Sequence, residues 1–335
     1  MRESKWPGSL RDEIVFNTFP GAGGRVAYFA DTLVRQAVAA GFDRAGAVQQ
    51  LDGGLSPLID GWIPDSHWAA GGSGFKAYTL DTARAGSLLD QAGWRDEDGD
   101  GIREYHGTGG DYSCQRGKWS VADKTPLTPT LILPDGDPHR LALAQKLQID
   151  LKTIGIGLQI QPVSPATMFN PSGPVQHRDF DMALISTAIG PDPGGISQWV
   201  GADVFKHPLD KTPVHRWQLE QRWLDSEQLI ERLALNNVPS PDNDWQGQNY
   251  AGWCNEQADI AVVQANLSFD VNSRKGFYAQ AEPLIAGDAP VIPLAYRPRI
   301  VASRTYVCGI QPGPYDSLVW NAAAWHFDPQ GTCSP

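Results

Sequence analysis

The clearest pattern along the chain is an apolar run, an amphipathic helix and a second apolar run. Residues 130–133 read Thr-Leu-Ile-Leu, and Asp137 followed by Pro138 is typical of a helix N-cap and first helical position. Apolar residues then recur at spacings of three and four until Gly155, and an alternating stretch begins at Ile156. This strand–helix–strand pattern predicts a parallel pair of strands joined by a right-handed crossover.

The two spacings of apolar residues, alternation for strands and three or four residues for helices, recur along the rest of the chain. Strands are predicted at 13–18, 130–133, 156–161, 180–186 and 291–296. Helices are predicted from Asp31, over about 79–93, over 137–155, and at 216–235, 256–268 and 272–287. The stretch 94–128, which carries Gly, Asp and Ser, predicts turns and a hairpin. Alternation of strands and helices over this length predicts an α/β fold.

Composition narrows the class of protein. The chain has 335 residues, of which 41% are hydrophobic and 19% charged, so it can bury a sizeable core. Its formal net charge is −11, which argues against nucleic acid or an anionic membrane as the main partner. No apolar run reaches the ~18 residues that a membrane-spanning helix needs, and the N-terminus lacks the apolar region of a signal peptide.

One acidic segment resembles the start of a calcium-binding loop. Asp96, Asp98 and Asp100 alternate with other residues ahead of a glycine, but Gly107 stands where such a loop needs its last glutamate. The sequence therefore favours a tight hairpin over a metal site, with these three aspartates as the weak metal candidates. No triad, metal-ligand cluster or phosphate-binding loop has recognisable spacing, so we expect neither an enzyme nor a cofactor.

Two further features leave alternatives open. Four cysteines, Cys114, Cys254, Cys308 and Cys333, form no CxxC pair, and predict either two long-range disulfides in an oxidising compartment or four buried thiols. A second group, Asn249, Tyr250 and Trp253, lies in a predicted loop. It predicts either a surface that recognises flat polar ligands or a plug that packs on the core.

Several short stretches, in a consistent order, resemble family 5 of the bacterial extracellular solute-binding proteins, which bind peptides, nickel or oligosaccharides. The matching stretches are Val34-Arg35-Gln36-Ala37, Phe42-Asp43-Arg44, 83–94, 98–102, 144–156, Phe180-Asp181, Asp192-Pro193, 249–253, Arg274 with Tyr278, and 289–294. The resemblance implies one lobe of a periplasmic-binding-protein-like type II clamp, with a mixed sheet flanked by helices. It also implies an extracytoplasmic chain, in the periplasm or at the cell surface. Its partners would be a small ligand, oligopeptide or oligosaccharide, and the permease subunits of an ABC-type importer.

The resemblance also implies a division of the chain. Residues 1–24 correspond to a leader and hinge strand from the first lobe, 25–296 to the second lobe, and 297–335 to a tail that belongs to the first lobe. Most of the first lobe would then be missing. The tail residues Val319, Trp320 and Trp325 should consequently lack a partner surface. In an exported chain we expect disulfides, first of all Cys308–Cys333, which would contribute roughly 3 kcal/mol.

The resemblance finally indicates a ligand face. In peptide-binding relatives an aspartate after the 180–186 strand pairs with the peptide's α-ammonium group, and Ile189 stands at that position here. An enclosed ammonium without a counter-charge is costly, and Asp192 is expected to be a turn residue. The substrate-binding candidates are Ile189, Asp192, Gln198, Trp199, Asn249, Tyr250 and Trp253. The last five, aromatic residues and amides, suit a neutral, hydroxyl-rich ligand such as an oligosaccharide. A protein-interaction or receptor module on the same scaffold, or a non-functional fragment, is the alternative.

Overall fold

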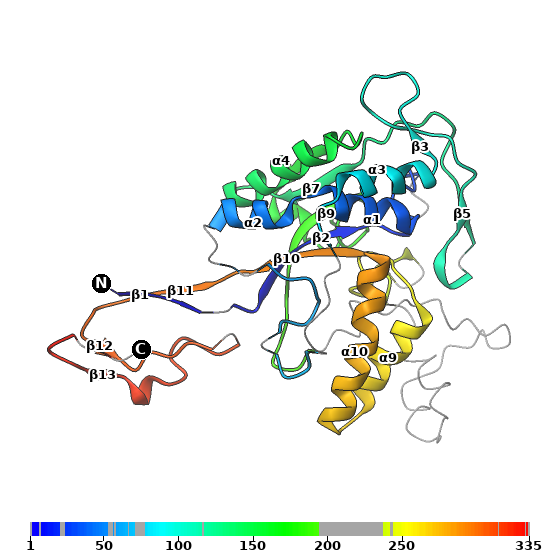
Figure 1. Ribbon diagram of the computed structural model, residues 1–335. Coiled ribbons are helices and arrows are strands. Elements are labelled where there is room, and N and C mark those ends of the chain that lie inside the picture. The colour runs from blue at the N-terminus through cyan, green and yellow to red at the C-terminus, as the bar shows by residue number, and fades with distance from the viewer. Residues whose placement is uncertain are drawn as a thin grey trace.

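A five-stranded mixed sheet forms the centre of the molecule (Figure 1). The computed structural model describes residues 2–6, 8–20, 24–52, 56, 58–65, 67–70, 78–115, 117–193, 237–241, 244–313, 315–331 and 333. Within these residues the strand order is β10 (Val291–Tyr296), β2 (Leu10–Phe16), β9 (Met182–Ala188), β7 (Thr130–Pro134) and β8 (Gln159–Val163).

The parallel part of the sheet confirms the predicted strand–helix–strand unit. β7 pairs in parallel with both β8 and β9, and α4 (Pro138–Lys152) connects β7 to β8. β8 begins at Gln159, whereas the sequence predicted Ile156. The reason is that Ile156 and Leu158 are buried in the connection, where Gly157 donates its backbone N–H to the carbonyl oxygen of Leu127.

The antiparallel part of the sheet extends further toward the N-terminus than predicted. β2 pairs antiparallel with β10 and β9, and its first residues, Leu10 to Asp12, face Ala188 to Ser186. The strands therefore begin at Leu10 and end at Ala188, not within the predicted 13–18 and 180–186. The predicted helix 216–235 lies outside the described residues.

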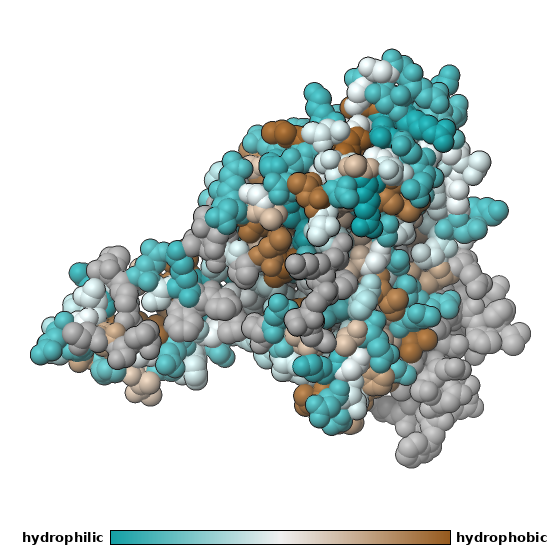
Figure 2. All heavy atoms as spheres, in the orientation of Figure 1, coloured by the Kyte–Doolittle hydropathy of each residue, from teal (hydrophilic) through white to brown (hydrophobic). Residues whose placement is uncertain are grey.

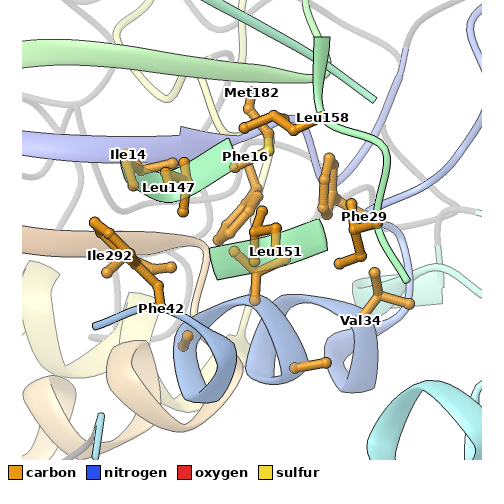
Figure 3. Close-up of a cluster of buried hydrophobic side chains, with 14 of the residues drawn as sticks. Ile14, Phe16, Phe29, Val34, Phe42, Leu147, Leu151, Leu158, Met182 and Ile292 are labelled. Carbon is orange, nitrogen blue, oxygen red and sulfur yellow. The ribbon is translucent and has the colours of Figure 1, made fainter. Parts of the chain in front are cut away.

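Helices cover both faces of the sheet and make a three-layer fold (Figure 1). One layer holds α1 (Thr32–Gly41), α2 (Arg44–Asp52), α3 (Thr82–Gln91) and α4, and the other holds α5 (Pro165–Met168), α9 (Glu256–Leu267) and α10 (Val271–Asp288). Side chains alternate along a strand, so Ile14 and Phe16 enter the first core and Val15 enters the second. Figure 3 shows the first core, where Phe16 lies among Leu147, Leu151 and Phe29. The predicted α/β class is confirmed.

Two hairpins pack against the first core, and a disulfide ties one of them to the segment before α9. β3 (Trp94–Arg95) pairs with β4 (Glu104–Tyr105), and β5 (Gly110–Asp111) pairs with β6 (Lys118–Trp119) around the 3-10 turn η1 (Ser113–Gln115). Cys114, in this turn, is bonded to Cys254, 140 residues further along the chain. Cys308 and Cys333 form the second disulfide, as predicted. The alternative of four buried thiols is therefore wrong.

An arm and a tail extend away from the three layers (Figure 1). The arm is a two-stranded antiparallel ribbon of β1 (Arg2–Trp6) and β11 (Arg299–Ser303). The tail beyond it contains β12 (Val307–Cys308), η3 (Ala322–Ala324) and β13 (His326–Phe327). Val319 and Trp320 of the tail are 57% and 56% exposed, whereas Trp325 is half-buried.

Candidate functional site

The arm joins the body at one particular edge of the central sheet. β7 and β9 are parallel and end at this edge, where β2 begins and β10 ends. The parallel β7–β9 pair meets the antiparallel β2 here, so the strand direction changes at the same place. In open α/β sheets, ligands bind outside the carboxyl ends of the parallel strands. The polar residues at this edge are therefore the first candidates for a functional site.

Asp12 is the centre of a charged cluster at this edge. Its Oδ2 accepts a hydrogen bond of 2.8 Å from Nε of Arg297, the residue that follows β10. Its Oδ1 accepts a hydrogen bond from the hydroxyl of Ser186 and a longer one, 3.4 Å, from Nη2 of Arg140. Arg140 also donates to Ser186 at 2.5 Å. One carboxylate thus connects β2, β9, the first turn of α4 and the root of the arm.

Asp137 is the second carboxylate of the cluster and also the N-cap of α4. Its Oδ1 accepts the backbone N–H groups of His139 and Arg140, at 3.0 and 3.2 Å, and its Oδ2 lies 3.3 Å from Nη2 of Arg297. Partial burial opposes ionisation of Asp137, but the Arg140 N–H and the two guanidinium groups outweigh it and hold its pKa below the usual value. For Arg297, burial likewise opposes the charge, and Asp12 and Asp137 nevertheless raise its pKa.

A pocket of about 520 Å³ opens beside this cluster. That volume is within the usual range for small-molecule sites. Its described lining residues are Asp12, Val48, Ser56, Asp137, His139, Arg140, Leu143, Leu184, Leu294, Ala295, Arg297, Pro298 and Ile300. Figure 2 shows hydrophobic residues gathered between α2 and β10, close to where the arm leaves the body. We call this cavity the arm-root pocket.

The charged side chains of the cluster are partly engaged with one another. Both carboxylates already accept bonds on each oxygen. Arg297 uses Nε and Nη2, and Arg140 uses Nη2, while Nε of Arg140 is buried 3.7 Å from Oδ2 of Asp137. Nη1 of each arginine has no hydrogen-bond partner among the described residues. The two carboxylates and the two guanidinium groups balance each other's charge, and the Nη1 donors suit an acceptor such as a carboxylate or a carbonyl oxygen.

The opposite face of the same edge carries a buried ion pair. Arg11 and Glu13 are 2% and 0% exposed, and Nε of Arg11 donates to Oε2 of Glu13 at 2.8 Å. Thr187 donates to Oε1 of Glu13 at 2.9 Å, and Nη1 of Arg11 donates to the carbonyl of Trp62 at 2.7 Å. Burial of a charged pair is tolerated only with such complete pairing, so this group fixes the start of β2 against the end of β9.

The loop after β9 holds two of the residues that the sequence proposed for the ligand. Ile189 is 6% exposed and packs in the second core, with its backbone N–H bonded to the carbonyl of Ser9. Asp192 forms a two-point ion pair with Arg274, at 2.7 and 2.8 Å, and the Arg274 guanidinium lies over Trp68. Both residues are at the arm edge of the sheet, but neither lines the arm-root pocket.

The other described candidates lie at the opposite edge of the sheet. The carbonyl of Ala251 accepts hydrogen bonds from Thr18, which follows the far end of β2. Asn249 is fully buried and donates to the carbonyl of Trp253, and the Trp253 indole donates to Asp288. The cluster therefore packs on the core, while Tyr250 is half-buried. Gln198 and Trp199 lie outside the described residues.

The cluster residues Asp12, His139, Arg140 and Arg297 were not identified from the sequence. Two signals could have indicated them. Asp12 interrupts the apolar side of a strand that otherwise faces the core, and polar residues follow directly after β7, at the carboxyl end of a parallel strand. Arg297 carries no such signal, because only the turn from β10 into the arm brings it to Asp12.

The acidic segment forms the predicted hairpin loop between β3 and β4. Asp96 accepts backbone hydrogen bonds from Gly99 and Gly101, which tightens the turn. Oxygen atoms of Asp96, Asp98, Asp100 and Glu104 lie within 4.8 Å of one another, on an exposed surface. Glu104 is a member that the sequence argument did not include.

Comparison with known proteins now identifies relatives of the chain. Residues 7–204 match the model of the family described as bacterial extracellular solute-binding proteins, family 5 Middle. A di/tripeptide-binding protein of Pseudomonas aeruginosa is 25% identical over 289 residues, which cover 85% of this chain and 41% of that protein. A probable deoxycholate-binding periplasmic protein of Escherichia coli is 30% identical over 118 residues, which cover 33% of this chain and 21% of that protein.

Solved structures have the same fold. The oligopeptide-binding protein of Thermus thermophilus, in complex with a pentapeptide, superposes with a TM-score of 0.71 at 23% identity, covering 92% of this chain and 45% of that one. The oligopeptide-binding protein AppA of Bacillus subtilis gives 0.69 at 20% identity, covering 98% and 52%. The chain thus spans about half the length of these relatives. None of its described helices is long and apolar enough to cross a membrane.

Proposed function

This chain belongs to the bacterial extracellular solute-binding proteins of family 5, and on that premise we propose that it captures a small solute for an ABC-type importer. The observation that carries the proposal is the arm-root pocket, about 520 Å³ in volume, at the carboxyl edge of the sheet. Its charged cluster joins the body to the arm, so a ligand bound there would touch the part of the chain that leads out of this lobe.

We propose that the body, residues 25–296, acts as the second lobe of a two-lobed clamp. Residues 1–24 would supply a leader and hinge strand, and 297–335 a tail that packs on the first lobe. Among the described residues, two chain segments join the body to the arm, near Gly8 and Arg297, and such a narrow connection suits a hinge. Exposure of Val319 and Trp320 supports a covering partner for the tail, since apolar residues of this size gain stability when buried.

For the ligand we favour a short peptide over an oligosaccharide. The sugar hypothesis depends on Asn249, Tyr250 and Trp253, and these residues are at the edge of the sheet away from the pocket. Asp192 is engaged with Arg274, so it offers no simple counter-charge for an α-ammonium group. The spare donors of Arg140 and Arg297 instead suit the carboxylate end of a peptide. Two disulfides fit an extracytoplasmic location, as in the family, with permease subunits as partners.

Saturation-transfer NMR on this chain, with tripeptide and maltooligosaccharide pools, tests the proposal. We expect transfer to tripeptides, and a loss of it in Arg140→Gln, because that substitution removes a charged donor of the pocket. Arg95→Gln, an exposed arginine of β3, is the matched control and should leave the transfer unchanged. Transfer to neither pool, in the presence of a folded protein, would contradict solute capture.

A second candidate function is a protein-interaction module on the same scaffold. The exposed apolar residues of the tail, among them Val319, Trp320 and Phe327, are the observation that favours it. Such a module would bind a protein partner through the tail with or without an intact pocket. Arg140→Gln therefore separates the two functions, because it should affect only solute capture.

A further inference from the structure

We infer that the arm-root pocket takes up an aliphatic side chain of the ligand, with a ligand acceptor group held at its charged rim. The inference rests on the proposed function and adds the chemical class of the ligand to it. The apolar lining of the pocket, rather than its charged cluster, carries the inference.

The floor of the pocket is aliphatic and rigid. Val48 of α2, Leu143 of α4, Leu184 of β9 and Leu294 of β10 line it, and all four belong to the first core, with exposed fractions of 0–7%. Residues packed into a core are held in fixed rotamers, so the floor has a defined shape before a ligand arrives. Because α2, α4, β9 and β10 each contribute one of these residues, the packing of the folded chain fixes the shape of the floor.

The mouth of the pocket carries Ile300, the second residue of β11, which is 56% exposed. A ligand side chain lying between Ile300 and the floor would be in contact with apolar surface on both sides. Among the described lining residues there is no Phe, Tyr or Trp. A sugar ring would consequently find no aromatic face on which to stack.

The polar groups of the pocket point to the same ligand class. Asp12 and Asp137 already accept bonds on each oxygen, from Ser186, Arg140, Arg297 and the start of α4. A ligand ammonium or hydroxyl would meet two carboxylates whose charge the two guanidinium groups already balance. A carboxylate or carbonyl oxygen would instead meet spare guanidinium donors at the rim, while the apolar part enters the floor.

The test is methyl NMR on this 335-residue chain with labelled Leu, Val and Ile, titrated with three probes. N-acetyl-leucine carries a branched side chain and a carboxylate, N-acetylglycine has the carboxylate alone, and maltotriose has neither. We expect N-acetyl-leucine to shift the methyls of Leu143, Leu184 and Leu294, with an affinity at least about tenfold that of N-acetylglycine. Maltotriose should leave these methyls unmoved.

Two exposed substitutions keep the test independent of folding. Ile300→Ser, at the mouth, should weaken N-acetyl-leucine about threefold or more, and Ile149→Ser, on the outer side of α4 at 64% exposure, should not change it. Equal affinities for the two acetylated amino acids, no shift of the floor methyls with N-acetyl-leucine, or tighter binding of maltotriose would each overturn the inference. If the protein still binds tripeptides in those cases, the proposal of solute capture stands and only the inference about the pocket fails. If it binds no solute at all, the proposal and the inference both fail.

Discussion

Replacing Asp12 by asparagine separates the structural role of the charged cluster from its role in binding. In Asp12→Asn the shape is kept, but one charge is lost and the side-chain amide faces the guanidinium of Arg297 or of Arg140. The side chains of Asp12, Arg140 and Arg297 are 19%, 14% and 38% exposed, so the hydrogen bonds are only partly screened by solvent. Losing one charge-assisted bond of this kind should cost about 2 kcal/mol of the free energy of unfolding.

The same substitution should strengthen the binding of an anion. At about 6 Å, one unit charge less near a bound carboxylate is worth ~0.7 kcal/mol even at the dielectric constant of water, or about a threefold gain in affinity. Urea denaturation measures the first effect, and an N-acetyl-leucine titration the second. Asp65→Asn removes the same charge at an exposed position and is the control. Unchanged stability, or weaker anion binding than in the wild type, would refute the assignment of Asp12 as the carboxylate that restrains both arginines.

Three further predictions concern the crossing between body and arm, the Cys114–Cys254 disulfide and the dependence of stability on pH. Gly8→Ala should destabilise the arm by about 1–3 kcal/mol, since its Cβ would overlap the carbonyl oxygen of Arg297, and faster amide exchange in β1 would reveal it. Removing the Cys114–Cys254 disulfide by a double serine substitution should lower unfolding stability by about 4 kcal/mol, because it closes a long loop, and a loss under 1 kcal/mol in urea would contradict this. The pKa of Asp137 is lower in the folded chain than in the unfolded chain. The stability that its ionised form contributes is therefore present above the unfolded-state pKa and is lost as the pH falls through the folded-state pKa. In acid titrations, the wild type should lose more stability below about pH 4 than Asp137→Asn does.

The fold was largely predictable because its elements are encoded locally. The helix from Asp137 has an N-cap, a proline and apolar spacing, and the structure has all three features in place. Strand ends were less predictable. Leu10 to Asp12 become strand because they pair with the end of β9 and, at Arg11 and Asp12, with the end of β10. Pairing with a segment 176 residues away, as between Arg11 and Thr187, has no local sequence signal.

The site was less predictable than the fold, for a related reason. Asn249 and Trp253 have the chemistry of a recognition surface, but their burial is a property of the packed molecule, in which Asn249 bonds to the Trp253 carbonyl and the Trp253 indole to Asp288. Conversely, Asp12, Arg140 and Arg297 are far apart in the sequence, and each has an ordinary local role as a strand, helix or loop residue. Only the edge of the sheet, where β7, β9 and β10 end and β2 begins, brings their charges within hydrogen-bonding distance.

The central claim is that a solute binds in the arm-root pocket, and a map of chemical-shift changes on this chain tests it most directly. A tripeptide of alanine, leucine and alanine would be titrated into the protein with methyl and arginine side-chain labels. We predict that the saturable shifts gather at Leu143, Leu184, Leu294 and Arg140, around the pocket. Saturable shifts that gather instead at Ala251 and Ala258, beside Tyr250 and Trp253 at the other edge of the sheet, would contradict the account.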